Sequence, residues 1–184
     1  MFTLKLIVLD RDGVINQDSE QFIKSPEEWK AIPGSLEAIA RLNRAGLNVV
    51  VATNQSGIAR GYFSDETLKK IHQKMEDELA KHHGKLAGIF ICPHGPGDNC
   101  LCRKPKPGLL LEIAKKLQIK PEEMLAVGDS MRDILAAQAC GAKAILVKTG
   151  KGAKTIASAT KEFNVPIFEN LADAVTAILS GKIC

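Results

Sequence analysis

The sequence predicts an α/β fold, in which a parallel sheet has helices on both of its faces. Strand-like and helix-like segments alternate along the chain, as they do in βαβ units. The predicted strands are short, continuous apolar runs, which are typical of strands buried on both faces. The chain has 184 residues, enough for one substantial domain, and we expect residues 1–184 to form a single domain.

The first predicted strand is the apolar run 6–9, and an irregular stretch, 16–33, follows it. A helix over 35–45 ends at Gly46, a residue that favours the left-handed conformation of a helix C-terminus. A longer helix from 64 towards 82 repeats apolar residues at helical spacing. The same patterns predict the remaining elements, which are strands at 47–52, 88–92, 124–127, 144–147 and 167–168, and helices at 108–117, 131–139 and 171–179.

The composition is that of an ordinary globular protein, with 45% hydrophobic and 25% charged residues. No apolar run could span a membrane and no signal-peptide pattern opens the chain, so we expect a cytoplasmic protein without a membrane partner. The net charge of +4 suits a small anionic substrate, whereas one Trp, one Tyr and six Phe offer few surfaces for stacking bases. We therefore expect no nucleic-acid partner, and a monomer, since no coiled-coil pattern is visible.

Two carboxylates, Asp10 and Asp12, follow the first predicted strand directly, and Gly13 comes next. Ligands of open α/β sheets bind beyond the carboxyl ends of the strands, which is where these side chains should lie. Two anions this close repel each other unless a cation or a shared proton relieves them. A divalent metal with oxygen ligands is the natural relief, although Asp residues also occur at strand ends as simple turn formers.

Four polar clusters, including Asp10 with Asp12, each follow a predicted strand, so loops at one edge of the sheet should bring them together in one cleft. These clusters are Asp10 with Asp12, Thr53 with Asn54, Cys92 with His94, and Asp129. In such a cleft Asp10 could attack phosphorus as a nucleophile, while Asp12 could donate and then accept a proton. A cation held by Asp10 and Asp129 would offset charge repulsion, and the Thr53 hydroxyl could contact a phosphoryl oxygen. The set predicts phosphoryl transfer.

A basic loop over 101–108 contains Arg103, Lys104 and Lys106 together with two prolines that stiffen it. A fixed lysine could stabilise phosphoryl charge, and an arginine could bind a hydroxyl or a second phosphate. Asp133, on the first turn of the helix after Asp129, is expected to support that residue or the helix N-terminus.

Three of the five cysteines and one histidine lie in the same loop: Cys92, His94, Cys100 and Cys102. Their type and spacing predict a closed Cys₃His zinc site, which would be structural because no ligand position is left open. Reduced, unmetallated thiols are the simpler alternative, and a disulfide within Cys-x-Cys would be strained. Cys140 is predicted to be a small core residue, and His72, His82 and His83 to be solvated.

The ordered motifs resemble those of the haloacid dehalogenase (HAD) superfamily of aspartyl phosphatases. The resemblance is carried by Asp10-Arg11-Asp12-Gly13-Val14, Thr53-Asn54-Gln55-Ser56-Gly57, Cys102-Arg103-Lys104-Pro105 and Gly128-Asp129. Within the superfamily the chain is similar to the D-glycero-D-manno-heptose 1,7-bisphosphate 7-phosphatases. This narrower similarity is carried by Asn16-Gln17-Asp18, Ser56-Gly57-Ile58-Ala59-Arg60-Gly61 and the Cys/His loop, and it extends to about Gly152.

The resemblance implies a Rossmann-like, capless HAD fold in which Asp10 is the nucleophile and Asp12 the general acid and base. It implies Mg²⁺ on Asp10, the backbone carbonyl of Asp12 and Asp129, with Thr53 and Lys104 contacting the phosphoryl group. The implied substrate is a small phosphorylated sugar, whose product would enter nucleotide-activated heptose and lipopolysaccharide biosynthesis. The residues expected to bind it are Asp18, Ser19, Glu20, Gln21, Asn54, Gln55, Ser56, Arg103 and Ser130.

Three alternatives remain open from the sequence. The short spacing between His94 and Cys100 resembles that of histidinol-phosphate phosphatases, whereas residues 56–61 favour the heptose enzymes. A polynucleotide 3′-phosphatase is disfavoured by the scarce aromatic residues. A zinc-stabilised nucleic-acid-binding module would use Arg103, Lys104 and Lys106, but it would leave the three aspartates without a purpose. The preferred anomer at C1 is not determined by the sequence.

Overall fold

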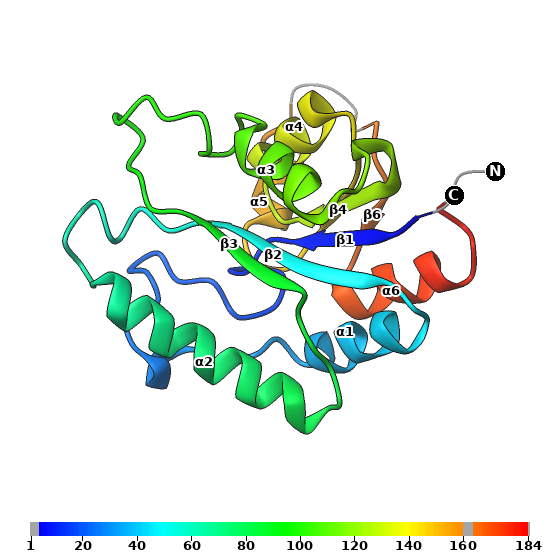
Figure 1. Cartoon of the computed structure of the whole chain (residues 1–184), viewed down its shortest axis with the longest axis horizontal. Coiled ribbons are helices and arrows are strands. Elements are labelled where there is room, and N and C mark those ends of the chain that lie inside the picture. The colour runs from blue at the N-terminus through cyan, green and yellow to red at the C-terminus, as the bar shows by residue number, and fades with distance from the viewer. Residues whose placement is uncertain (1–3, 160–163, 184) are drawn as a thin grey trace.

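The computed structural model describes residues 4–159 and 164–183, and its centre is a six-stranded parallel sheet (Figure 1). The strand order is β3-β2-β1-β4-β5-β6, and every pair of neighbours is parallel. This confirms the predicted α/β class. The strands are β1 (Leu6–Leu9), β2 (Asn48–Asn54), β3 (Gly88–Cys92), β4 (Met124–Gly128), β5 (Lys143–Val147) and β6 (Ile167–Phe168).

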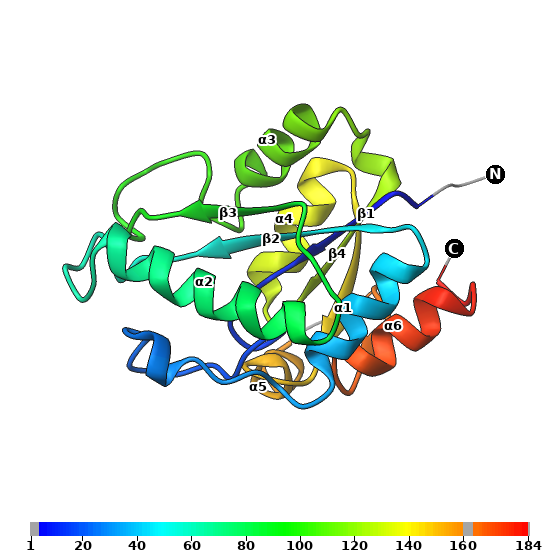
Figure 2. The ribbon, with the colours of Figure 1, turned by 60° about the horizontal axis from the view of Figure 1, so that its bottom comes forward.

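Helices cover both faces of the sheet. Helices α1, α2 and α6 lie on one side, and α3 and α4 lie on the other (Figures 1 and 2). Alternate residues of β1 face the two layers: Ile7 and Leu9 belong to one apolar cluster, Leu6 and Val8 to the other. The helices are α1 (Ser35–Arg44), α2 (Asp65–Lys81), α3 (Gly108–Leu117), α4 (Met131–Cys140), α5 (Gly152–Ala157) and α6 (Leu171–Leu179), with short 3₁₀ turns η1 (Pro26–Glu28) and η2 (Pro121–Glu123).

Three sequence-based expectations need correction. Strand β2 continues to Asn54, two residues past the predicted end, and the six-residue helix α5 was not predicted. His72 is buried, with 8% of its surface exposed, because the face of α2 that carries it packs against the sheet. The expectation for Cys140 is confirmed, since it is buried in the core.

Strand β1 lies at the switch point of the sheet, with β2 on one side and β4 on the other. Leu9 is in register with Val51 of β2 and Val127 of β4, so the residues that follow all three strands emerge at one edge. Ligand sites of doubly wound sheets form in the crevice at such a point. The connections here, 10–34 and 93–107, contain only the short turn η1, so the fold is capless as predicted. Among the described residues, no helix is long and apolar enough to cross a membrane.

Candidate active site

A cavity of about 430 Å³ opens at the carboxyl ends of β1, β2 and β4. The structure brings the predicted catalytic residues together here, with Asp10, Asp12, Thr53, Lys104 and Asp129 all in its wall. All but one of the predicted substrate residues also line it; these are Asp18, Ser19, Glu20, Asn54, Gln55, Ser56, Arg103 and Ser130.

Gln21 is the one predicted substrate-binding residue that does not line the cavity. It is exposed, and its backbone N–H donates to Oγ of Ser19 while its carbonyl accepts from Lys24. The next two residues, Phe22 and Ile23, line the cavity in its place. Phe22, which follows the exposed Gln21, has a positive φ of 66°, a conformation that non-glycine residues adopt mainly in turns.

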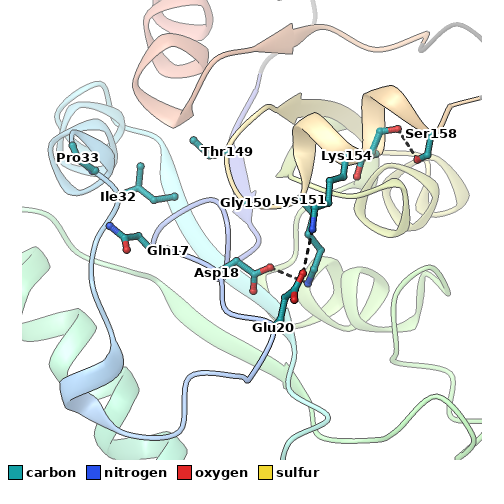
Figure 3. Close-up of a pocket in the computed structure, with 11 residues that line it drawn as sticks. Gln17, Asp18, Glu20, Ile32, Pro33, Thr149, Gly150, Lys151, Lys154 and Ser158 are labelled. Carbon is teal, nitrogen blue, oxygen red and sulfur yellow. Dashed lines mark hydrogen bonds and ion pairs between the residues drawn. The ribbon is translucent and has the colours of Figure 1, made fainter.

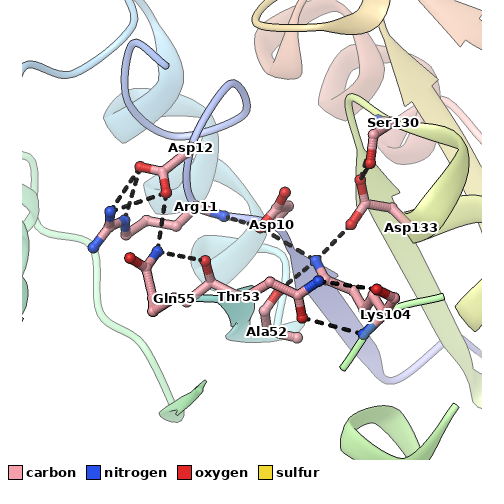
Figure 4. A network of polar contacts seen from close by, with 10 residues as sticks. Asp10, Arg11, Asp12, Ala52, Thr53, Gln55, Lys104, Ser130 and Asp133 are labelled. Atoms are coloured by element: carbon pink, nitrogen blue, oxygen red, sulfur yellow. Dashed lines mark hydrogen bonds and ion pairs between the residues drawn. The ribbon is translucent and has the colours of Figure 1, made fainter. Parts of the chain in front are cut away.

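The Lys104 side chain lies between two carboxylates at the base of the cavity. Its Nζ atom is 3.2 Å from Oδ1 of Asp10, and it donates to Oδ1 of Asp133 and to the Ala52 carbonyl (Figure 4). Burial alone would lower the pKa of Lys104, but the two carboxylates outweigh it and the pKa is raised. Lys104 is therefore a fixed positive charge, whereas Lys106 is exposed and contacts Asn99 and Cys100.

Asp129 is enclosed by backbone. Its Oδ2 accepts a hydrogen bond of 2.7 Å from the Lys151 N–H, and a Cβ atom at Gly13 or Gly150 would lie only 2.0 or 2.2 Å from it. Burial, followed by repulsion from Asp10, raises the pKa of Asp129 to about 7. Burial likewise raises the pKa of Asp10 to about 6, despite the nearby Lys104.

Carboxylate oxygens of Asp10, Asp129 and Asp133 all lie within 4.8 Å of one another, a spacing that a divalent cation could bridge. Asp133 is already committed to other partners. Its Oδ1 accepts from Lys104, and its Oδ2 accepts from the Ser130 N–H and hydroxyl. Asp133 thus supports the N-terminus of α4, as predicted, and Asp10 and Asp129 are the carboxylates left for a metal.

Asp12 accepts from the side chains of three residues. Arg11 donates to both of its oxygens at 2.8–3.0 Å, and Asn16 and Gln55 add one bond each at 2.9 Å. Burial would raise the pKa of Asp12, but the Arg11 charge and these bonds lower it. Gln55 also donates to Oγ1 of Thr53, which leaves the Thr53 hydroxyl proton available for a ligand (Figure 4).

Four cationic residues line the cavity near its mouth, and the sequence motifs predicted only Arg103 among them. The other three are Arg60, Arg132 and Lys151. Burial and the charges of Arg132 and Arg60 lower the pKa of Arg103, so the three guanidinium groups are close enough to repel one another. Among the described residues none of the three arginines forms an ion pair with a carboxylate. An anionic ligand would relieve this repulsion.

A second cavity of about 710 Å³ lies beside the first and shares Asp18, Glu20 and Lys151 with it (Figure 3). Lys151 pairs with Asp18 at 2.9 Å, and Lys154 pairs with Glu20 at 3.1 Å. The two ion pairs connect the loop after β1 to the start of α5. The Lys151–Asp18 pair is the more buried of the two, whereas the Lys154–Glu20 pair is almost fully exposed and should contribute little.

The predicted zinc ligands converge on one point. The Sγ atom of Cys92 lies 3.2–3.7 Å from Nδ1 of His94 and from Sγ of Cys100 and Cys102, Nδ1 of His94 lies 3.3 Å from Sγ of Cys102, and the four possible ligand atoms all lie within 4.8 Å of one another. Ligand atoms in a tetrahedron around zinc lie roughly 3.5–3.8 Å apart, so the cluster is close to the size that a zinc ion needs. Arg103 donates to the His94 carbonyl at 3.0 Å, which ties the cluster to the cavity.

Comparison with protein families places the chain among known hydrolases. The family model for haloacid dehalogenase-like hydrolases matches residues 7–103, and a HAD-hydrolase-like model matches residues 101–174. The D-glycero-beta-D-manno-heptose-1,7-bisphosphate 7-phosphatase of Bordetella bronchiseptica is 51% identical over 96% of this chain and 98% of its own length. The enzyme of that name from Pseudomonas putida is 52% identical over 92% and 96%.

Solved structures agree with the sequence relatives. The D,D-heptose 1,7-bisphosphate phosphatase of B. bronchiseptica, complexed with magnesium and phosphate, has a TM-score of 0.93 and 50% identity, covering 97% of this chain and 99% of that one. The corresponding phosphatase of Burkholderia thailandensis has a TM-score of 0.76 and 43% identity, covering 96% and 99%. Motifs, fold and relatives agree, and the chain belongs to the haloacid dehalogenase-like hydrolases, within the family of the D-glycero-beta-D-manno-heptose-1,7-bisphosphate 7-phosphatases.

Proposed function

We propose that this chain removes the 7-phosphate of D-glycero-beta-D-manno-heptose 1,7-bisphosphate, giving the heptose 1-phosphate and inorganic phosphate. The observation that carries the proposal is that the chain is about half identical, over nearly its full length, to relatives of that name, and their names support the choice of the β anomer. The buried Asp10–Lys104 pair supports the phosphatase chemistry independently of the relatives.

The reaction has two steps on one side chain. An oxygen of Asp10 attacks the phosphorus, the bond to the C7 oxygen breaks, and that oxygen takes a proton from Asp12. Water then attacks the phosphorus of the aspartyl phosphate, gives its proton to Asp12, and the bond to Asp10 breaks. The two steps need Asp12 in its protonated and its ionised form in turn, and the lowered pKa of Asp12 favours the ionised one.

The charge of the phosphoryl group is offset by fixed residues. Lys104 supplies a buried positive charge beside Asp10, and the Thr53 hydroxyl can donate to a phosphoryl oxygen. Asp10 and Asp129 could hold a divalent cation between them; burial, and then repulsion between carboxylates, raises the pKa values of both. We assign Mg²⁺ to these two side chains and the backbone carbonyl of Asp12; when bound, it would neutralise the repulsion between carboxylates and substrate.

The arginines at the cavity mouth support a substrate with two phosphates. Asp10 lies at the base, so a substrate with its 7-phosphate there would extend its other end towards Arg60, Arg103 and Arg132. Guanidinium groups without a carboxylate partner suit a second anionic group. The predicted lining residues, Asp18 to Glu20 and Asn54 to Ser56, would contact the sugar between the two phosphates.

We assign Zn²⁺ to the cluster of Cys92, His94, Cys100 and Cys102, whose ligand distances suit a structural site. Such a site needs reduced thiols, which supports a cytoplasmic location. We further propose that residues 1–184 act as a single domain and as a monomer, that neither nucleic acid nor a membrane is a partner, and that the product enters nucleotide-activated heptose and lipopolysaccharide biosynthesis.

Phosphate release with Mg²⁺ tests the substrate. We expect the β anomer of heptose 1,7-bisphosphate to give the highest kcat/KM, above the α anomer and far above histidinol phosphate. A higher kcat/KM for histidinol phosphate would overturn the proposed substrate but leave the aspartyl-phosphate chemistry in place. A 3′-phosphorylated oligonucleotide serves as a further control and should not be hydrolysed.

A further inference from the structure

Arg11 lies completely buried behind Asp12, with 0% of its surface exposed. Its Nε and Nη2 atoms hold both carboxylate oxygens of Asp12, with distances of 3.0 Å from Nε and 2.8 and 2.9 Å from Nη2 (Figure 4). A planar guanidinium that binds a carboxylate through two of its nitrogens fixes the direction as well as the position of that carboxylate. The orientation of Asp12 therefore depends on what orients Arg11.

The third nitrogen of Arg11 contacts helix α2. Its Nη1 atom lies 3.3 Å from Nε2 of His72, a residue that is only 8% exposed. The guanidinium is always charged and can only donate, so Nε2 of His72 must accept and its ring proton must be on Nδ1. Burial, together with the Arg11 charge, lowers the pKa of His72 to about 4, in agreement with a neutral ring.

We infer that His72 is a positioning residue for the phosphatase reaction: by accepting from Arg11, it fixes the guanidinium that directs Asp12 at the leaving oxygen. The inference rests on the proposed role of Asp12 as the proton donor. Among the described residues, Asp12 and His72 are the side chains that the Arg11 guanidinium contacts, and only His72 contacts Nη1. Without an acceptor at position 72, Nη1 would be buried and unsatisfied. We expect the guanidinium then to rotate towards another acceptor, which would weaken its hydrogen bonds to Asp12.

Two substitutions separate positioning from packing. His72→Gln keeps an acceptor close to the place of Nε2, whereas His72→Leu fills similar space without one. Each variant is compared with the wild-type enzyme on a sugar phosphate, here heptose 1,7-bisphosphate, and on p-nitrophenyl phosphate. The alkoxide of a sugar needs a proton to leave, but p-nitrophenolate is a weak base and leaves without one.

We expect His72→Leu to lower kcat/KM for the sugar phosphate on the order of 10–100-fold, the cost of a misplaced catalytic group, with KM little changed. The kcat/KM for p-nitrophenyl phosphate should stay within about twofold, since this parameter reports only steps up to the first phosphoryl transfer. His72→Gln should recover most of the sugar-phosphate activity. Equal losses on both substrates, no loss on either, or a His72→Gln variant as impaired as His72→Leu would each overturn the inference.

A measurement on the wild-type protein keeps the inference testable even if His72→Leu does not fold. Nitrogen NMR of ¹⁵N-histidine-labelled enzyme should show His72 neutral, with Nε2 unprotonated and Nδ1 protonated, across the pH range in which the enzyme is active. A proton on Nε2 would contradict the contact. If the wild-type enzyme rejects heptose bisphosphate but hydrolyses another primary sugar phosphate, the proposed substrate is wrong, and the variants are compared on that sugar phosphate instead.

Discussion

The Nζ atom of Lys104 lies 3.2 Å from Oδ1 of Asp10 and is shared with Asp133, so a single ammonium group balances one half-buried and one buried carboxylate. Lys104 is only 4% exposed. Water stabilises the charges of Lys104 and Asp133 poorly, so these charges depend strongly on one another and on the partly exposed Asp10. The same contacts that hold the protein together here also arrange the nucleophile and the positive charge that its proposed reaction needs.

Lys104→Met should therefore damage both stability and activity. Removing the ammonium leaves the buried Asp133 and the half-buried Asp10 without their counter-charge, and we expect the free energy of unfolding near neutral pH to fall by about 3–5 kcal/mol. Phosphate release should fall by about two orders of magnitude or more. Lys106→Met is the matched control, because Lys106 is exposed and close by in the same loop; its effect should be under about 1 kcal/mol. Denaturant unfolding and phosphate assays measure both quantities, and equal effects of the two substitutions would contradict this role for Lys104.

Asp10→Asn tests the nucleophile without removing volume. We expect phosphate release to fall by at least about 10³-fold, since an amide cannot form the acyl phosphate. The melting temperature should be maintained or raised, because burying the ionised Asp10 is unfavourable and Lys104 keeps Asp133 as a partner. Asp77→Asn, on an exposed face of α2, controls for loss of a carboxylate. Turnover by Asp10→Asn near the wild-type rate would exclude an aspartyl intermediate.

Gly13→Ala tests how closely backbone approaches the second carboxylate of the proposed Mg²⁺ site. The Cβ atom of an alanine would lie 2.0 Å from Oδ2 of Asp129, so Asp129 has to move, and activity should fall by about 100-fold or more. Gly61 has a similar positive φ, 70° against 84°, but a Cβ atom there would meet no described atom within 4 Å. Gly61→Ala should thus show only the conformational cost, roughly 1 kcal/mol in unfolding, with its activity retained. Similar activity in the two variants would contradict the close approach.

Much of the fold could be predicted because both faces of the sheet are buried. Strands such as β1 then read as continuous apolar runs, and each ends where its polar residues begin. Helix α5 was not predicted because six residues are too few to show helical periodicity. The end of β2 at Asn54 was missed because the strand continues into the polar motif. These are ambiguities of local pattern, which contacts with neighbouring strands resolve in the folded protein.

The site residues that were missed have a different explanation. Lys151 follows β5, and the tendency of polar clusters at strand ends to meet at one edge could have identified it. Arg60 lies in the motif 56–61 and Arg132 lies two residues after Ser130, so both segments were predicted to be near the site, but the sequence does not show which of their side chains face the cavity. His72 lies on a helix with many polar residues, and only packing decides that its ring is turned inward to Arg11.

The pH dependence of stability should report the crowded carboxylates. The pKa of Asp129 is raised from 3.8 to about 7, so over that range the folded protein keeps a proton there that the unfolded chain has lost. The stability that this proton contributes is fully present below the unfolded pKa and is lost as the pH rises through about 7. In buffer without magnesium, the free energy of unfolding of Asp129→Asn should rise relative to that of the wild type as the pH increases over this range, by at most roughly 1.4 kcal/mol per pH unit.

Other groups change stability with pH in the opposite direction. The pKa of His72 is lowered from 6.5 to about 4, so His72 adds stability as the pH rises between these values. This contribution is present in both proteins and cancels when their free energies of unfolding are compared. Urea unfolding at several pH values between the unfolded and folded pKa of Asp129 measures the difference. Added Mg²⁺ should stabilise the wild type most at the highest pH, where Asp10 and Asp129 are ionised, and should not stabilise Asp129→Asn to the same extent. A difference that is constant with pH would refute the raised pKa.

Cys100→Ser or Cys102→Ser should release zinc, if the Cys/His cluster holds it. Loss of the ion would loosen the loop 93–107, which contains both Arg103 and Lys104. Arg103 also depends on this loop because it donates to the His94 carbonyl. We expect about one zinc fewer per chain by elemental analysis, and a lower melting temperature. We also expect kcat/KM to fall more for heptose bisphosphate than for p-nitrophenyl phosphate, because p-nitrophenyl phosphate has no second phosphate for Arg103 to bind. Cys140→Ala, in the core away from the loop, should leave the metal content unchanged. A Cys100→Ser protein with full zinc content and unchanged melting would show that the loop is held by other contacts.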